Sequence, residues 1–407
     1  MNRSAARVRE AGVSLIELMV ALLIGSLLLL GVLQIFEASR VSYQLSTGLA
    51  RNQENARFAM DFLQRELRMA GHLGCVNDQS RFLPENTSGT RLALASTFTT
   101  TPAGYTTASF PLRFDMGIQG FEFVGSAGGN QVTLPATPVV ASGAAAWLPQ
   151  VDAGLYGNLS NPVAGSDIVV LRYFSPMGAQ MQSFNPAATP MTISVDATQV
   201  PRLTEGLANP GLFGISDCMN AAVFQATSRT NGLLTVGVGG LNAIALTGNE
   251  SFVIGQARVY RAEVVVFYVG INASQNPSLY RLRYSAVPGG ALVVENEELV
   301  EGVESLQLRY GQDSATSATV RPTGNIGSGL VASALLPTAD PVTAWRRVGS
   351  VEIGLVVRST ERAAAPMREA GAAELSALGV RFATPDDGRY RAVYEDTIAL
   401  RNRLFGN

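Results

Sequence analysis

The amino-acid sequence predicts an α+β protein in which a long N-terminal α-helix packs on an antiparallel, β-rich body with long loop insertions. Three observations predict this class. An uncharged apolar run spans residues 18–36, residues 53–70 contain no Pro or Gly and repeat apolar side chains at helical spacing, and several later segments alternate apolar and polar residues. The 41 Gly and 19 Pro residues suit a body whose strands are joined by many turns.

The composition excludes several functional classes. Only 15% of the 407 residues are charged and 47% are apolar, which argues against a disordered chain. All 30 basic residues are arginine, and 32 acidic residues bring the net charge to −2, so the chain lacks the basic surplus of a nucleic-acid-binding protein. One histidine and two cysteines exclude a zinc site of four cysteines or of two cysteines and two histidines, and they argue against a histidine-based catalytic centre.

The N-terminal region is organised like a membrane anchor. Residues 1–12 form a short basic leader, and residues 13–36 form the expected membrane helix. The uncharged run between Glu17 and Glu37 has 19 residues. As a helix it would be roughly 28 Å long, close to the hydrocarbon thickness of about 30 Å. It is longer than a secretory signal, and no small-x-small cleavage site follows it. One interpretation is therefore a plain anchor with its basic side in the cytoplasm.

Glu17, at the start of the apolar run, has two interpretations. It can be a boundary residue at the membrane edge. It can also serve a partner, because a carboxylate in apolar surroundings seeks a cation. Cleavage after Gly12 would create an ammonium group on Val13, four residues from Glu17. The carboxylate would then meet the α-amino group of its own chain or of a neighbour.

The segment Gly12-Val13-Ser14-Leu15-Ile16-Glu17-Leu18 resembles the class III signal of type IV prepilins. The resemblance implies that a prepilin peptidase in the inner membrane cleaves after Gly12 and methylates the new N-terminus at Val13. It also implies that Glu17, the fifth mature residue, guides docking of the subunit into a growing filament. Val13 departs from the Phe or Met that is usual at the first mature position.

Residues 37–70 are predicted to continue the helix with an amphipathic half. Its large apolar residues form one helical stripe, which we expect to pack on the body: Phe58, Phe62, Leu63 and Leu67. Gly71 is positioned to end the helix. Gly48 and the polar residues 39–47 mark a place where we expect a bend or local melting.

The body, residues 71–407, is predicted to be rich in antiparallel strands, because period-two alternation marks strands with one buried face. The strand candidates are residues 168–174, 264–269, 280–284, 292–294, 305–310 and 351–358. Residues 86–165 and 311–343 are rich in small and polar residues with weak periodicity, so we expect both to be long surface insertions. A short helix is expected over residues 366–378.

Cys75 and Cys218 are most simply one disulfide in a domain exported across a membrane, and the alternative is two buried free thiols. The disulfide would close a loop of about 140 residues. His72 lies three residues before Cys75, but one histidine and one cysteine fall short of a metal site. We therefore expect no metal and no cofactor.

Further segments resemble the PilW family of type IV pilus assembly proteins, the large minor pilins, over nearly the whole chain. The resemblance is carried in order along the chain by Arg57-Phe58-Ala59-Met60, Ala70-Gly71, Gly74-Cys75, Gly165-Ser166-Asp167, Ser216-Asp217-Cys218, Val223-Phe224-Gln225, Leu299-Val300-Glu301-Gly302-Val303-Glu304, residues 306–310, residues 351–358 and Leu400-Arg401-Asn402.

This second resemblance implies a pilin-like fold and a minor pilin that helps to initiate or cap a type IV pilus and supports adhesion and twitching motility. The implied partners are the prepilin peptidase, other minor pilins, the major pilin, the inner-membrane assembly platform and membrane lipid, but no nucleic acid. The implied location is the bacterial inner membrane, as a single-pass precursor with a periplasmic body, and then the pilus fibre. Because the body is large, we expect it at the tip.

Two alternatives stay open. A minor pseudopilin of a type II secretion system would share the leader, Glu17 and the helix. An exported binding or enzymatic domain that only uses an anchor would keep residues 1–12. We expect no enzyme, because no P-loop, Gly-x-Ser-x-Gly or metal motif is present. The sequence also pairs none of the candidate acids with a nucleophile: Asp167, Asp217, Glu301 and Glu304.

Overall fold

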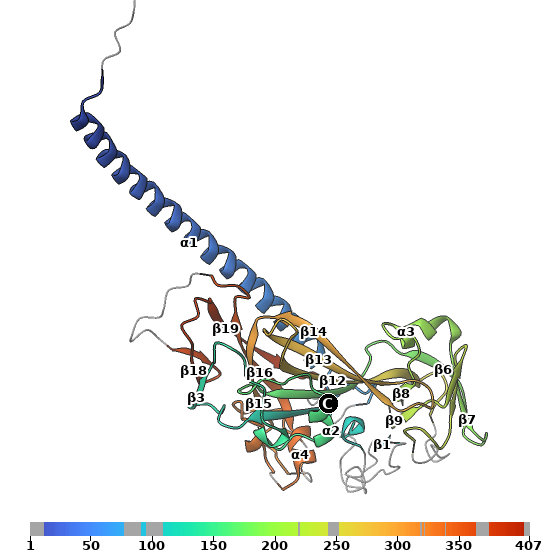
Figure 1. Cartoon of the computed structure of the whole chain (residues 1–407). Coiled ribbons are helices and arrows are strands. Elements are labelled where there is room, and N and C mark those ends of the chain that lie inside the picture. Colours follow the sequence, from blue (N-terminus) through green and yellow to red (C-terminus); the bar gives the residue numbers. More distant parts are fainter. Residues whose placement is uncertain are drawn as a thin grey trace, which may run out of the picture.

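The long N-terminal helix, α1 (Leu15–Leu67), projects from a β-rich body in the computed structural model (Figure 1). The structure describes residues 12–76, 91–94, 109–218, 220–242, 252–317, 320, 322–337, 339–363 and 374–402, with the backbone alone for residues 91–94. The architecture is α+β and pilin-like, as predicted, with a mostly antiparallel body.

α1 is one unbroken α-helix of 53 residues, so the bend or melting expected near residues 39–48 is wrong. Gly48 does not bend the helix but allows a close packing contact. A Cβ atom on Gly48 would lie 2.5 Å from the Cβ of Ala363, so glycine is needed for the loop at Ala363 to approach the helix this closely. The helix ends at Leu67, and Gly71 has a positive φ of 71° in the turn that follows.

The buried face of α1 combines large apolar residues with two alanines and an asparagine. It is made of Asn52, Ala56, Ala59, Met60, Leu63 and Leu67. The sequence predicts Leu63 and Leu67 correctly, but it also predicts Phe58, which is 50% exposed. Ala56 and Ala59 are fully buried because their small side chains let the helix backbone approach the strands closely. The predicted stripe counted only large apolar residues, so it did not include these two alanines.

The strand β12 (Arg258–Ile271) organises the largest sheet. Its carboxy-terminal part pairs with β5 and β13, and its first residues pair with β6 and β8, all antiparallel. One half of the sheet has the order β4-β2-β5-β12-β13-β14. Its other strands are β2 (Ile118–Phe123), β4 (Trp147–Leu148), β5 (Ile168–Phe174), β13 (Pro277–Ala286) and β14 (Leu292–Glu301).

The other half of this sheet has the order β1-β9-β8-β12-β6-β7-β11-β10 and has its own apolar core. Its strands are β1 (Arg91–Leu94), β6 (Ala179–Asn185), β7 (Met191–Val195), β8 (Leu212–Ser216), β9 (Asn220–Gln225), β10 (Ser228–Thr230) and β11 (Leu233–Val236). β1 is parallel to β9, and the other pairs are antiparallel. In Figure 1 this half lies on the far side of β12 from β16 and β19.

Two smaller sheets complete the body, β15-β16-β19 and β17-β18-β3. Their strands are β3 (Gln131–Thr133), β15 (Val303–Gln312), β16 (Val348–Arg358), β17 (Leu375–Ala377), β18 (Val380–Ala383) and β19 (Arg391–Ala399). β16 is buried on both faces: Val357 packs in the core that includes α1, and Val356 packs with Leu375 and Phe382. All the strand candidates of the sequence lie in strands. The helix expected over residues 366–378 lies mostly outside the described residues, and its end forms β17 instead.

Short helices connect the strands. They are the α-helices α2 (Ala153–Asn158), α3 (Val200–Thr204) and α4 (Pro341–Arg346), and the 3-10 helices η3 (Phe110–Leu112), η4 (Ala144–Ala146), η5 (Ala197–Gln199) and η6 (Ala332–Ala334). α2 begins where the side chain of Asp152 accepts a hydrogen bond from the N–H of Leu155, and α4 begins at a similar cap on Asp340.

The expectation that residues 86–165 form a surface insertion is wrong for the described part of this segment, residues 109–165. They contribute β2 to the large sheet, and their large apolar residues, including Phe114, Phe121 and Trp147, cover the face of β5 and β12 that is opposite α1. A few large side chains in a segment of small residues are enough to build this core. In the second expected insertion, residues 311–343, the described residues are mostly exposed or half-buried loop.

Cys75 and Cys218 form the predicted disulfide, which joins residues 143 positions apart. Cys75 follows the end of α1, and Cys218 lies in the turn between β8 and β9. The disulfide therefore ties the end of the long helix to the half of the sheet that contains β8 and β9.

Candidate functional site

The N-terminal end of α1 is closed by a reciprocal pair of hydrogen bonds between Ser14 and Glu17. The Oγ atom of Ser14 accepts a bond from the N–H of Glu17 at 3.2 Å, and Oε2 of Glu17 accepts a bond from the N–H of Ser14 at 3.2 Å. This capping box satisfies two backbone donors at the helix start. It also holds the Glu17 carboxylate beside Val13, whose side chain is 73% exposed.

The first half of α1 exposes its apolar surface. From residue 13 to residue 36 every residue is exposed except the half-buried Gly31. An 18-residue window of this helix has a mean hydropathy of 2.6, and the helix is long and apolar enough to cross a membrane. Such a surface needs lipid or other helices around it, because water is an unfavourable neighbour for so many apolar side chains.

Gly25 and Gly31 are not required by the fold of the subunit itself. A Cβ atom on either would meet no atom of the described chain within 4 Å. Glycine in a helix interior costs roughly 1 kcal/mol relative to alanine. Ser26 lies next to Gly25, and its hydroxyl donates to the carbonyl of Leu23 at 2.8 Å, so its polar group is satisfied within the helix. These small residues leave a narrow surface that another helix can approach.

The second half of α1 is fixed to the body by buried polar side chains as well as by apolar packing. Asn52 is fully buried, donates from Nδ2 to the carbonyl of Val357 at 2.8 Å and accepts from the hydroxyl of Tyr394 at 3.0 Å. Asn55 donates to the carbonyl of Glu301 at 3.0 Å. Because each buried amide has its partners, these contacts also fix the rotation of the helix on the sheets.

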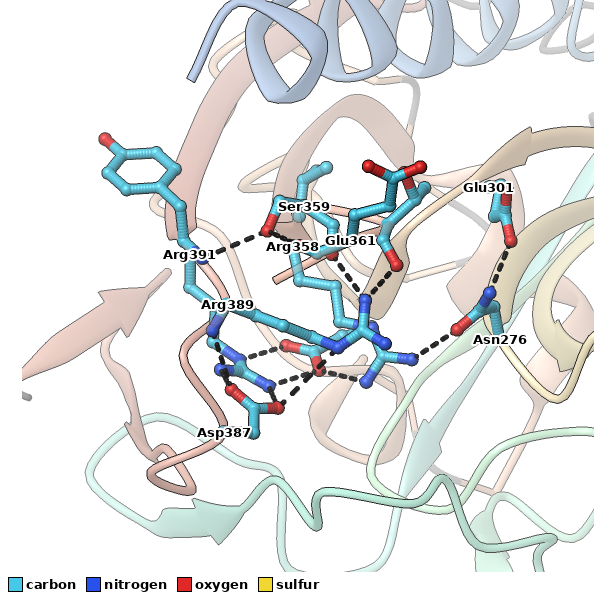
Figure 2. A network of polar contacts seen from close by, with 12 residues as sticks. Asn276, Glu301, Arg358, Ser359, Glu361, Asp387, Arg389 and Arg391 are labelled. Carbon is cyan, nitrogen blue, oxygen red and sulfur yellow. Dashed lines mark hydrogen bonds and ion pairs between the residues drawn. The ribbon is translucent and has the colours of Figure 1, made fainter. Parts of the chain in front are cut away.

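A network of charges lies beside α1 where the helix leaves the body (Figure 2). Arg391 donates to both oxygens of Glu304 at 2.7 and 3.0 Å and to both oxygens of Asp387 at 2.7 Å. Arg358 donates to Glu304 at 3.2 Å. Burial acts to raise the pKa of Asp387, but hydrogen bonds from Arg391 and Arg389 outweigh it and keep this pKa below its ordinary value.

The network reaches the loop that contacts the helix. Arg358 donates to Asn276 at 2.9 Å, and Asn276 donates to Glu301 at 2.6 Å. Arg389 donates to the carbonyl of Ser359 at 2.9 Å, and this residue begins the loop 359–363 that meets Gly48. The charges therefore hold β15, β16, β19 and this loop in one arrangement under α1.

The four acids considered as catalytic candidates all act as hydrogen-bond acceptors within the fold. Glu301 and Glu304 belong to the network just described. Asp167 is buried and accepts bonds from the N–H groups of Phe123 and Leu308, each at 2.9 Å. Asp217 accepts a bond from the N–H of Asn220 at 2.6 Å, next to the disulfide. Sequence reasoning missed Arg358, Asp387 and Arg391, because only the strand register brings them together.

His72 and Cys75 each interact with another residue of the fold. Nδ1 of His72 lies 2.9 Å from the carbonyl of Phe174, and burial lowers the pKa of this histidine. The sulfur of Cys75 is bonded to Cys218, so it offers no thiolate to a metal. Within the described ranges, no three or more His, Cys, Asp or Glu residues lie together as possible metal ligands.

Two family models match the chain. Residues 7–33 match the prokaryotic N-terminal methylation motif, and residues 266–402 match the type IV pilus-assembly protein W, PilW. Together the two matches support a PilW-like pilin. No curated protein and no solved structure matches it significantly.

The matched ranges coincide with particular parts of the structure. The first covers the capping box and most of the exposed half of α1. The second begins within β12 and contains β13 to β16 and β17 to β19, which include the strands that hold α1 and the charge network. The apolar helix and the methylation motif fit a membrane-anchored pilin.

Proposed function

We propose that this PilW-like pilin is a minor subunit of a type IV pilus that helps to initiate or cap the fibre. In this proposal prepilin peptidase cleaves between Gly12 and Val13, methylates Val13, and leaves Glu17 as the acidic group that docks the subunit. The observation that carries the proposal is the Ser14–Glu17 capping box at the start of a fully exposed apolar helix. It presents a carboxylate at the place where cleavage creates an amine.

The physical steps follow from this arrangement. The apolar half of α1 holds the precursor in the inner membrane, with its leader in the cytoplasm and its body in the periplasm. On assembly the helix exchanges lipid contacts for contacts with other pilin helices, and the surface at Gly25 and Gly31 allows close approach. A Glu17 carboxylate that pairs with an N-terminal ammonium in this apolar medium sets the axial register between subunits.

The partners in this proposal are the prepilin peptidase, the other minor pilins, the major pilin, the assembly platform and lipid. A body of this size would crowd every layer of a thin fibre, which supports a position at the tip. Adhesion and twitching would follow from that position. The protein acts as a substrate of the peptidase in this scheme and catalyses no reaction itself.

The test compares two acids at opposite ends of the same apolar run. Glu17→Ala should reduce incorporation of the subunit into sheared fibres at least about tenfold, because it removes the docking charge. Glu37→Ala should leave incorporation unchanged, since Glu37 is exposed and lies 3.9 Å from Arg40. Equal incorporation of the two variants would refute the role of Glu17.

Processing is tested separately by the mass of the mature protein. The wild type should begin at N-methyl-Val13, and substitution of Gly12 by a bulky residue should leave the whole precursor. A mature protein that keeps residues 1–12 would instead favour an exported domain with a simple anchor.

A further inference from the structure

A surface cavity of about 480 Å³ lies beside the last turns of α1. The end of α1 and the turn that follows it form one wall, from Asp61 to Met69. The remaining lining comes from β5 and the residues just after it, β12 and β13, and includes Arg261, Glu263 and Arg283. The cavity is outside the N-terminal site and outside the charge network of Figure 2.

The inner part of this cavity has more positive than negative charge. Arg261 and Arg283 share one carboxylate, Glu263, whose side chain is 5% exposed. The Nε atom of Arg283 lies 3.6 Å from Glu263 Oε2, which is too long for a hydrogen bond. This buried Nε atom has no hydrogen-bond partner among the described residues. A guanidinium group can donate five hydrogen bonds, so the Arg283 group is poorly satisfied by the subunit alone.

The other acids around the cavity already have partners. Glu66 accepts a bond from the hydroxyl of Tyr173 and lies 3.2 Å from Arg281. Asp61 lies 3.0 Å from Arg65. Arg68, by contrast, forms no ion pair with any residue in the described part of the chain, and it is exposed just beyond the end of α1. The cavity therefore has uncompensated cations both inside and at its rim.

The position of the cavity indicates its occupant. Asp61 and Arg65 line it and also belong to the exposed face of α1, which includes the half-exposed Phe58, and the exposed Arg68 lines it just beyond the helix end. In a fibre whose subunits align their α1 helices, the surface beside α1 faces the neighbouring subunits. A carboxylate from such a neighbour would supply the missing negative charge and accept bonds from the guanidinium groups.

We propose that this cavity receives an acidic side chain of a neighbouring pilin subunit, bound between Arg283 and Arg68. The inference rests on the proposed incorporation of the chain into a pilus. It adds a second polar contact between subunits, on the periplasmic side, to the one formed by Glu17.

Photo-crosslinking in pilus-forming cells tests the proposal with the full-length chain. A photoreactive residue replaces Gln64, which lines the cavity, or Gln53, which is exposed on the same helix outside it. We expect the Gln64 probe to give an adduct with another pilin, joined at a peptide that contains Asp or Glu. The Gln53 probe should give no adduct with that peptide.

Charge variants then test the chemistry. Arg68→Glu should lower the yield of the Gln64 adduct about tenfold or more, and replacing the acid of the crosslinked peptide by Arg should restore it. Arg202→Glu, on α3 and outside the lining of the cavity, should have no effect. Arg68 is exposed, so its replacement leaves the fold intact, and an unchanged thermal unfolding curve would confirm this.

The outcomes separate this proposal from the proposed function. If the wild type is absent from fibres, the proposed function fails. If the wild type enters fibres but the Gln64 probe gives no pilin adduct, or Arg68→Glu leaves the adduct unchanged, only the cavity proposal is overturned. Binding of free aspartate to the purified protein by calorimetry, together with no adduct in cells, would instead make the cavity a site for a small carboxylate.

Discussion

Removal of the Arg391 guanidinium should sharply destabilise the body, because one buried and one partly buried carboxylate depend on it. The side chain of Arg391 is 4% exposed and makes four hydrogen bonds to Glu304 and Asp387. Arg391→Met would leave Glu304, 5% exposed, with Arg358 alone at 3.2 Å. Asp387 would keep only Arg389, whose backbone N–H donates to it at 3.1 Å and whose guanidinium lies 3.9 Å away. Breaking a buried charge pair from one side costs about 3–5 kcal/mol.

The measurement is urea unfolding of the full-length protein in detergent. Trp147 and Trp345 are both almost fully buried, so their fluorescence reports loss of the packed body. A matched control is Arg381→Met, because Arg381 and Glu374 form an exposed pair at 3.7 Å. Such a pair contributes at most about 1 kcal/mol. If Arg391→Met loses no more stability than Arg381→Met, the reasoning about the network is refuted.

Three further predictions concern other parts of the fold. Cys75→Ser with Cys218→Ser should lower the free energy of unfolding by up to about 5 kcal/mol on the chain-entropy account, since the bond closes a loop of 143 residues; thermal unfolding of the non-reduced proteins measures this, and equal midpoints would contradict it. Gly48→Val should separate loop 359–363 from α1 and speed proteolysis there, whereas Gly25→Val, which meets no atom within 4 Å, should not. Burial raises the pKa of Asp167 to about 7 from 3.8, so the stabilisation from its protonated form is complete below pH about 4 and lost as the pH rises through 7. Wild type should therefore gain stability relative to Asp167→Asn between pH 8 and pH 5, and a pH-independent difference in urea midpoints would show that Asp167 stays ionised.

The sequence predicts well those features whose signal is local. Nineteen uncharged residues in a row specify an exposed helix, and strict alternation specifies strands such as β13 and β16. The disulfide was also predictable, because an exported chain with two cysteines offers a single pairing.

Features that depend on contacts between distant segments could not be predicted in this way. Nothing in the sequence around Gly48 indicates that Ala363 packs against it. The sequence therefore predicts a flexible point in the helix at Gly48, where the structure has a close packing contact. Phe58 is as apolar as Leu63, and only the docking geometry places one outside and the other inside. The charge network likewise depends on register, because Glu304, Arg358 and Arg391 come from three different strands.

The place of the disulfide has a mechanical consequence. In the proposed pilus, tension applied to the β6–β11 half of the body would have to reach α1. The sulfur–sulfur bond offers a covalent route from the β8–β9 turn to the segment just beyond Leu67, which bypasses the hydrogen-bonded ladders between them. In a single-molecule pulling experiment, the oxidised body should therefore stay attached to α1 even after those ladders begin to shear. The reduced body should separate from α1 and unfold at the same force.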